Sequence, residues 1–145
     1  MTDTRRMIPR LGLVGIAAFA IYMVAQLHAQ TAVPATDFTN AGTAEVHDGQ
    51  GQVMLRGQFA TADQQDDDDV ERKAALQPAG SDEDAVGEAE IEFAKSAPKQ
   101  QEIEFAVRNL AAGTPLTFLI DGRVVGHASV DDRGRAEFEA TVPTK

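Results

Sequence analysis

The sequence predicts an all-β protein: a small antiparallel Ig-like sandwich of about seven strands, preceded by an N-terminal export or anchor helix. Three observations lead to this class. Apolar residues alternate with acids over 87–94, 102–107 and 136–140, as in strands with one face in a core and one in water. Short runs of this kind recur along the chain and are separated by turns that contain glycine. The N-terminal residues follow the order charged, apolar, small, which is typical of a secretory signal peptide.

Residues 1–29 form the predicted export segment. An uncharged run covers 11–27 and is followed by a small-residue cleavage site that ends at Ala29. A helix over this run would reach about 25 Å, slightly short of the ~30 Å hydrocarbon core. The positive charges before the run are Arg5, Arg6 and Arg10. Residues 1–29 are therefore predicted to be either a cleaved signal peptide or a retained membrane anchor.

The export signal has a bacterial style. The sequence of residues 4–8 resembles a twin-arginine export signal, from which Pro9 departs. We expect an exported protein that is periplasmic or extracellular, or that is anchored to the inner membrane. In the anchored case, the membrane would be contacted only through residues 8–28.

Composition excludes several classes of site and partner. The chain has no cysteine, so a disulfide framework, a thiolate metal site and a cysteine nucleophile are excluded. A small exported domain without disulfides must fold by packing alone, or with help from a partner or an ion. The formal net charge is −10, and an anionic protein repels phosphates and anionic lipids. Nucleic-acid binding is therefore not expected.

Beyond the export segment, the sequence indicates one folded unit. The polar residues 30–42 are predicted to be a linker, and 43–145 a single β domain. Residues 61–86 are rich in acids and poor in large apolar side chains, so they cannot offset the entropy of ordering. We expect a mobile acidic insertion there. Residues 70–76 could form two helical turns, which are marginal without packing.

The predicted strands follow in order along the domain. A hairpin is indicated by two alternating runs on either side of a glycine-rich turn at 48–51. The large apolar residues of the later runs should lie on one buried face, because each alternates with glutamate; they are Ile91, Phe93, Ile103, Phe105 and Phe138. The strands are expected over 43–47, 52–59, 87–94, 101–107, 115–120, 123–130 and 136–140.

Two registers compete at the turn that contains Asp121 and Gly122. A two-residue turn would place Leu116 opposite His127, so that His127 shares the buried face. A three-residue loop over 120–122 would pair Phe118 with Val124 and direct His127 to solvent. We favour the three-residue loop, because burying a histidine without a partner is unfavourable.

Acidic residues form the only dense cluster that could bind a ligand. Carboxylate oxygens are the ligands that Ca²⁺ prefers, but the spacing does not match an EF-hand, since the fifth position after a start at Asp66 is Val70. A solvated acidic loop and polar strand faces are the other explanation. If the strands pair around Pro98, Glu92 lies opposite Glu104, and such like-charge pairs require relief. The candidate calcium ligands are Asp66, Asp67, Asp68, Asp69, Glu92 and Glu104.

No constellation indicates catalysis. His127, Ser129 and Asp131 lie at alternate positions of one strand, so they project in parallel and are expected to be an ordinary polar face rather than a triad. No phosphate-binding loop and no hydrolase or metalloprotease motif occurs. We therefore expect a non-enzymatic protein of the bacterial cell envelope, a structural or interaction module with an unknown protein or envelope partner and no cofactor. The alternative is an envelope protein that binds divalent cations such as Ca²⁺.

Overall fold

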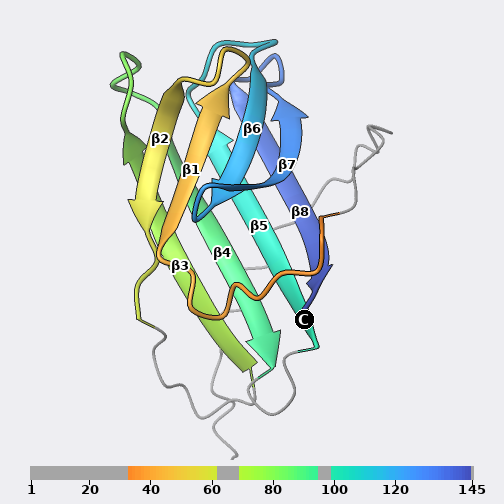
Figure 1. Cartoon of the computed structure of the whole chain (residues 1–145). Coiled ribbons are helices and arrows are strands. Elements are labelled where there is room, and N and C mark those ends of the chain that lie inside the picture. The colour runs from red at the N-terminus through yellow and green to blue at the C-terminus, as the bar shows by residue number, and fades with distance from the viewer. Residues whose placement is uncertain (1–32, 62–68, 95–98, 145) are drawn as a thin grey trace, which may run out of the picture.

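The computed structural model describes residues 33–61, 69–94 and 99–144, and the structural statements below concern these residues. Their regular structure is antiparallel β-sheet throughout (Figure 1), which confirms the all-β class. Within these ranges, no helix is long and apolar enough to cross a membrane. The predicted export segment 1–29 lies outside the described residues.

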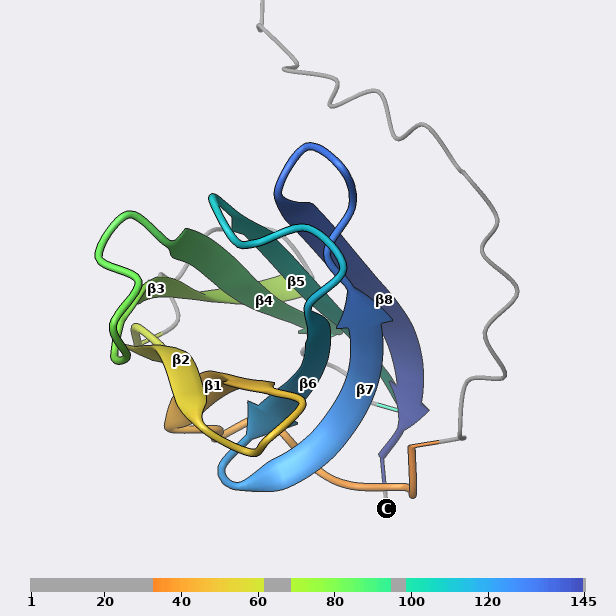
Figure 2. The ribbon, with the colours of Figure 1, turned by 90° about the horizontal axis from the view of Figure 1, so that it is seen from above.

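The described strands form one eight-stranded sheet in the order β7-β6-β1-β2-β3-β4-β5-β8. Figure 2 shows that this sheet curls until its end strands, β7 and β8, lie side by side, which gives it a nearly barrel-like shape. The sequence predicts about seven strands in an Ig-like sandwich, whereas β3 here joins β2 to β4 and makes one continuous sheet. The bounds are β1 Thr43–Asp48, β2 Val53–Gln58, β3 Asp69–Pro78, β4 Val86–Ala94, β5 Gln100–Arg108, β6 Pro115–Ile120, β7 Arg123–Ser129 and β8 Arg135–Pro143.

Strand β3 lies within 61–86, where the sequence predicts a mobile acidic insertion. That expectation is wrong for β3, and so is a helix over 70–76, because the strand pairs with β4 along most of its length. Ala74 and Leu76 are buried in the core, and the ladder to β4 satisfies the backbone. The alternating pattern of this strand is hard to recognise in the sequence because Arg72 takes an inward position, where an apolar residue would be expected.

Arg72 is tolerated at this position because it lies near the end of the barrel. Its Nη1 donates a hydrogen bond to the carbonyl oxygen of Thr39 at 2.9 Å, and its Nε donates to that of Ala60 at 3.3 Å. Its guanidinium also lies over the ring of Phe59, 5.8 Å from the centroid. The charged group therefore has two backbone acceptors and lies against one aromatic ring of the core.

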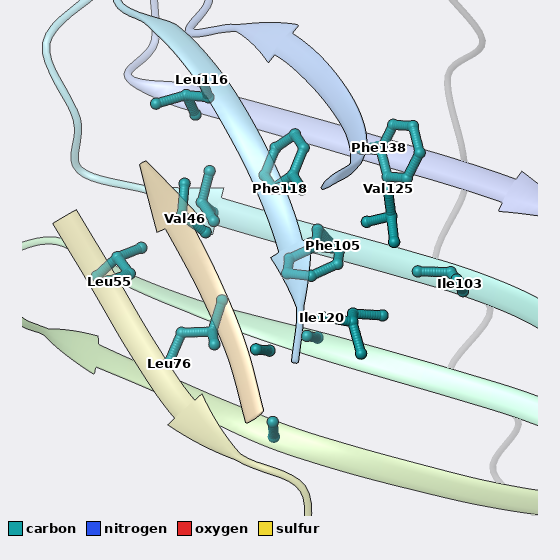
Figure 3. Packing of buried hydrophobic residues seen from close by; sticks show 14 of the residues in the cluster. Val46, Leu55, Leu76, Ile103, Phe105, Leu116, Phe118, Ile120, Val125 and Phe138 are labelled. Carbon is teal, nitrogen blue, oxygen red and sulfur yellow. The ribbon is translucent and has the colours of Figure 1, made fainter. Parts of the chain in front are cut away.

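The core is built from the alternating runs, as the sequence predicts. Ile91, Ile103 and Phe105 are completely buried, Phe138 is nearly so, and Phe93 is partly buried against the same cluster. Figure 3 shows aromatic rings from facing strands meeting in the interior. The ring centroids of Phe105 and Phe118 are 4.9 Å apart, and those of Phe118 and Phe138 are 5.5 Å apart.

Side-chain packing closes the barrel between β7 and β8. No ladder is found between these two strands in the described chain, although they lie side by side. A Cβ atom at Gly126 of β7 would lie 2.0 Å from the Phe138 ring of β8. Glycine is therefore required at this position, because the ring occupies the space of its side chain.

The connection between β6 and β7 differs from the loop that we favoured. Ile120 pairs with Arg123 across a two-residue turn, in which Asp121 and Gly122 both have positive φ (48° and 74°) as a type I′ turn requires. The register then shifts, because Leu119 pairs with Val124 but Phe118 pairs with Gly126, so that the extra residue lies within β7. Because of this shift, the turn keeps its preferred type I′ geometry and His127, later in β7, still faces solvent as predicted.

Residues 33–42, most of the predicted linker, are packed against the barrel. We call these residues the strap. Figure 1 shows the strap crossing the end of the barrel near the C-terminus, where the backbone N–H of Thr36 donates to the carbonyl oxygen of Pro143 at 3.2 Å. Phe38 and Ala41 of the strap belong to the buried core, so this part of the linker is a structural element of the domain.

Candidate functional site

The outer faces of β3, β4, β5 and β8 carry most of the described glutamates. Alternation places apolar side chains such as Ile91 and Ile103 inside and acids outside. These strands are neighbours in the sheet, so their outward side chains form one continuous surface. We call this surface the acidic wall; its members are Glu71, Glu88, Glu90, Glu92, Glu102, Glu104, Glu137 and Glu139.

The register aligns the carboxylates of the wall in rows across the strands. Glu104 of β5 pairs directly with Glu90 of β4 on one side and with Glu139 of β8 on the other. In the adjacent row, Glu92 pairs with Glu102. The prediction that Glu92 lies opposite Glu104 is therefore wrong, because the register differs by two residues. The predicted pairing of like charges is nevertheless present, and it involves more glutamates than expected.

Lys73 of β3 provides the counter-charge at one edge of the wall. Its Nζ forms an ion pair with Glu71 and lies 3.3 Å from Oε2 of Glu90. Among the described residues, the ion pairs of the wall all involve this lysine. No described base therefore forms an ion pair with Glu104 or Glu139 of this row.

The crowding changes the proton affinity of the wall. Burial raises the pKa of Glu104, and the charges of Glu90 and Glu139 raise it further. Burial also raises the pKa of Glu92, with the charge of Glu102 as the next cause. In both groups, burial and neighbouring negative charges therefore disfavour the ionised form.

The candidate calcium ligands are only partly brought together. Asp66, Asp67 and Asp68 lie outside the described residues, whereas Asp69 begins β3 opposite Ala94. Glu92 and Glu104 share the wall but occupy different rows. Over the part of the chain that the structure describes, no three histidine or acidic side chains are arranged to hold a metal ion.

A second polar cluster lies on the outer face of β1 and β2. His47 Nε2 lies 2.9 Å from Glu45 Oε2, and Arg56 Nε donates to Glu45 Oε1 at 2.7 Å. The hydrogen bond to His47 is the largest cause that lowers the pKa of Glu45. Sequence reasoning missed this cluster, although the alternation of Glu45 and His47 within β1 could have revealed it.

The predicted polar face of β7 does not form a triad. His127 Nδ1 lies 3.1 Å from Thr117 Oγ1 on the neighbouring strand. The carboxylate of Asp131 instead accepts hydrogen bonds from the backbone N–H groups of Arg133 and Arg135. The acid is therefore engaged in its own turn and does not orient the histidine, as the triad geometry would require.

Comparisons with other proteins add no functional assignment. No protein-family model, no curated protein and no solved structure matches this chain. What the arrangement can do must be judged from its chemistry. An array of aligned carboxylates on the outer face of the curled sheet can attract and bind cationic groups, with Lys73 as the counter-charge at one edge.

Proposed function

We propose that this protein is an exported, non-enzymatic interaction module of a bacterial cell envelope, and that its acidic wall docks a partner carrying cationic groups. The row of Glu90, Glu104 and Glu139 carries the proposal, because it holds like charges directly opposite one another. Such pairs destabilise a sheet. Local conflicts of this kind are expected where function opposes stability, and a cationic partner would neutralise the row.

The chemistry of the surface supports a charge-driven contact. Val124 is the large apolar side chain that the described residues leave exposed, and it lies on β7, which contributes no member of the wall. Docking on the wall would therefore depend on charge pairs, which are screened by salt and mainly affect the association rate and specificity. Anionic partners such as nucleic acids would be repelled.

The export assignment rests on residues 1–29 and places the proposed module in the periplasm, outside the cell, or on the outer side of the inner membrane. An Ig-like relationship would fit such a role, since small antiparallel domains of that type are common at cell surfaces.

Mass spectrometry of the native N-terminus distinguishes a cleaved signal from a retained anchor.

Binding of a labelled peptide of alternating lysine and alanine tests the docking proposal. The triple variant Glu90→Gln/Glu104→Gln/Glu139→Gln should bind the peptide about tenfold more weakly at low salt. The matched control Glu83→Gln/Asp84→Asn/Asp132→Asn removes the same charge from exposed positions outside the wall and should bind nearly as wild type does. Equal losses in both variants would show that only net charge matters and would refute a specific wall.

The calcium alternative is tested with the same proteins. Isothermal titration with calcium chloride should give no saturable heat if the wall binds organic cations alone. Saturable calcium binding by the wild type that disappears in the triple variant would instead support the divalent-cation function, in which clustered carboxylates act as ligands.

A further inference from the structure

The strap is held at the end of the barrel mainly through its backbone. Gln101 of β5 is completely buried, yet its side-chain amide is fully used. Its Oε1 accepts a hydrogen bond from the N–H of Phe38 at 2.7 Å, and its Nε2 donates to the carbonyl oxygen of Thr36 at 2.7 Å. Contact with the C=O of one residue and the N–H of the second residue along is what a neighbouring β-strand would make.

Two further side chains continue this recognition of the strap backbone. The carboxylate of Asp121 accepts hydrogen bonds from the N–H groups of Gly42 and Thr43, at 2.9 and 2.8 Å. Arg72 donates to the carbonyl oxygen of Thr39. These contacts recognise the backbone of a segment that turns at residues 38–41, where the N–H of Ala41 donates to the carbonyl oxygen of Phe38 at 3.0 Å, rather than the identity of its side chains.

One aromatic side chain anchors the strap. Phe38 is only 3 % exposed and belongs to the core cluster, while its neighbour Asp37 is exposed. Beside the strap, an open recess of about 400 Å³ lies against the turn between β6 and β7. It is lined by Ala35, Thr36, Asp37, Phe38, Asp121 and Arg123.

We propose that this end of the barrel is a binding site for a peptide with one buried aromatic residue followed by a turn, and that the strap is its resident occupant. The site combines a buried amide that pairs with the peptide backbone, a carboxylate and a guanidinium that hold the following residues, and an apolar seat for the ring. This site is separate from the acidic wall and does not depend on the function proposed for it.

The covalent link makes the strap a strong competitor. A segment joined directly to β1 has an effective concentration on the order of millimolar or higher. A free peptide will therefore bind the wild-type protein poorly. It should bind once the anchor of the strap is removed, because the amide, the carboxylate and the ring seat all belong to the barrel or to its turn.

The test uses the full chain with Phe38→Ala and a synthetic peptide of residues 33–42. We expect the peptide to bind this variant at least about tenfold more tightly than it binds the wild type. It should also raise the melting midpoint of the variant saturably toward that of the wild type. The matched peptide with alanine in place of Phe38 should do neither. Fluorescence anisotropy and thermal melts monitored by circular dichroism give the two readouts.

The outcomes separate cleanly. If Phe38→Ala is folded but neither binds nor is stabilised by the peptide, the proposal is overturned, and equal effects of both peptides overturn it as well. If the variant does not fold alone, refolding is repeated with each peptide present. Recovery of the β-sheet spectrum with the wild-type peptide only would support the site, and no recovery would exclude it.

Discussion

Replacing Glu104 with glutamine removes the central charge from a row of three glutamates and keeps the size and polarity of the side chain. Glu104 pairs directly with Glu90 and with Glu139, and Lys73 reaches only as far as Glu90. The substitution therefore relieves two like-charge pairs without disturbing an ion pair. We expect the variant to be more stable than the wild type at neutral pH.

The size of the gain follows from the number of pairs. A like-charge pair directly across a sheet costs up to about 1 kcal/mol. Although partial burial raises its pKa, the Glu104 side chain remains exposed to solvent, and screening reduces each contribution. We expect a total gain of about 0.5–1 kcal/mol. For a domain of this size that raises the melting midpoint by roughly 2–6 °C. The gain should nearly vanish in 1 M salt, where the Debye length is about 3 Å.

The same row predicts the pH dependence of the wild type. The pKa values of Glu104 and Glu92 are raised above their ordinary value of 4.5 by burial and neighbouring charge. Their contribution to stability is therefore full below pH 4.5 and is lost as the pH rises through the folded pKa. The lowered pKa of Glu45 has the opposite effect on stability. Its contribution is present above pH 4.5 and is lost only as the pH falls further. Stability should thus increase as the pH falls from 7 toward 5.

Thermal unfolding at pH 7 and pH 5, in low and high salt, measures both effects. The matched control is Glu83→Gln, which removes a charge from an exposed position outside the strands and should change stability by less than about 0.5 kcal/mol. Glu104→Gln should also show a smaller rise on acidification than the wild type. A variant that is less stable at pH 7, or whose gain persists in 1 M salt, would refute the electrostatic reasoning.

Three further substitutions test the packing. Phe105→Ala should cost about 3–5 kcal/mol in denaturant unfolding, because it empties a completely buried aromatic site; a near-wild-type midpoint would mean that the ring is not part of the core. Gln101→Leu should cost about 1–3 kcal/mol and increase amide exchange at Phe38, whose N–H loses its acceptor; unchanged exchange would contradict the proposed role of the amide. Gly126→Val should unfold or severely destabilise the protein, since the Phe138 ring fills the space, whereas a folded variant of normal stability would show that the seam can open.

The sequence predicts the β-class and much of the core because those features depend on a local pattern. Ile103 and Phe105 alternate with glutamates, and both are buried as that period requires. Strand β3 was missed because Arg72 interrupts its alternation, and the partners of that arginine are far away in the sequence. The strap was missed for a similar reason, since only the fold supplies Gln101 as a partner for its polar backbone.

Registers were harder to predict than elements. The wall glutamates are predicted as an outward face, but which of them oppose one another depends on where the chain reverses. The register differs from the predicted one by two residues, so the partner of Glu92 is Glu102 instead of Glu104. At the β6–β7 turn, the direction of His127 was predicted correctly, although for a reason that was only partly right. The extra residue lies inside β7 instead of in the loop, which lets a preferred turn and a buried Phe118 coexist.

The acidic wall covers one side of the barrel only. The opposite strands β1, β2, β6 and β7 carry two arginines, Arg56 and Arg123, against two acids, Glu45 and Asp48. The described strands therefore have an electric dipole with a component directed across the barrel. The field of a positively charged body exerts a torque on this dipole, which turns the wall toward that body before the surfaces touch. Alignment of this kind shortens the orientational search and can raise association rates about 10- to 1,000-fold, an advantage that disappears as ionic strength rises.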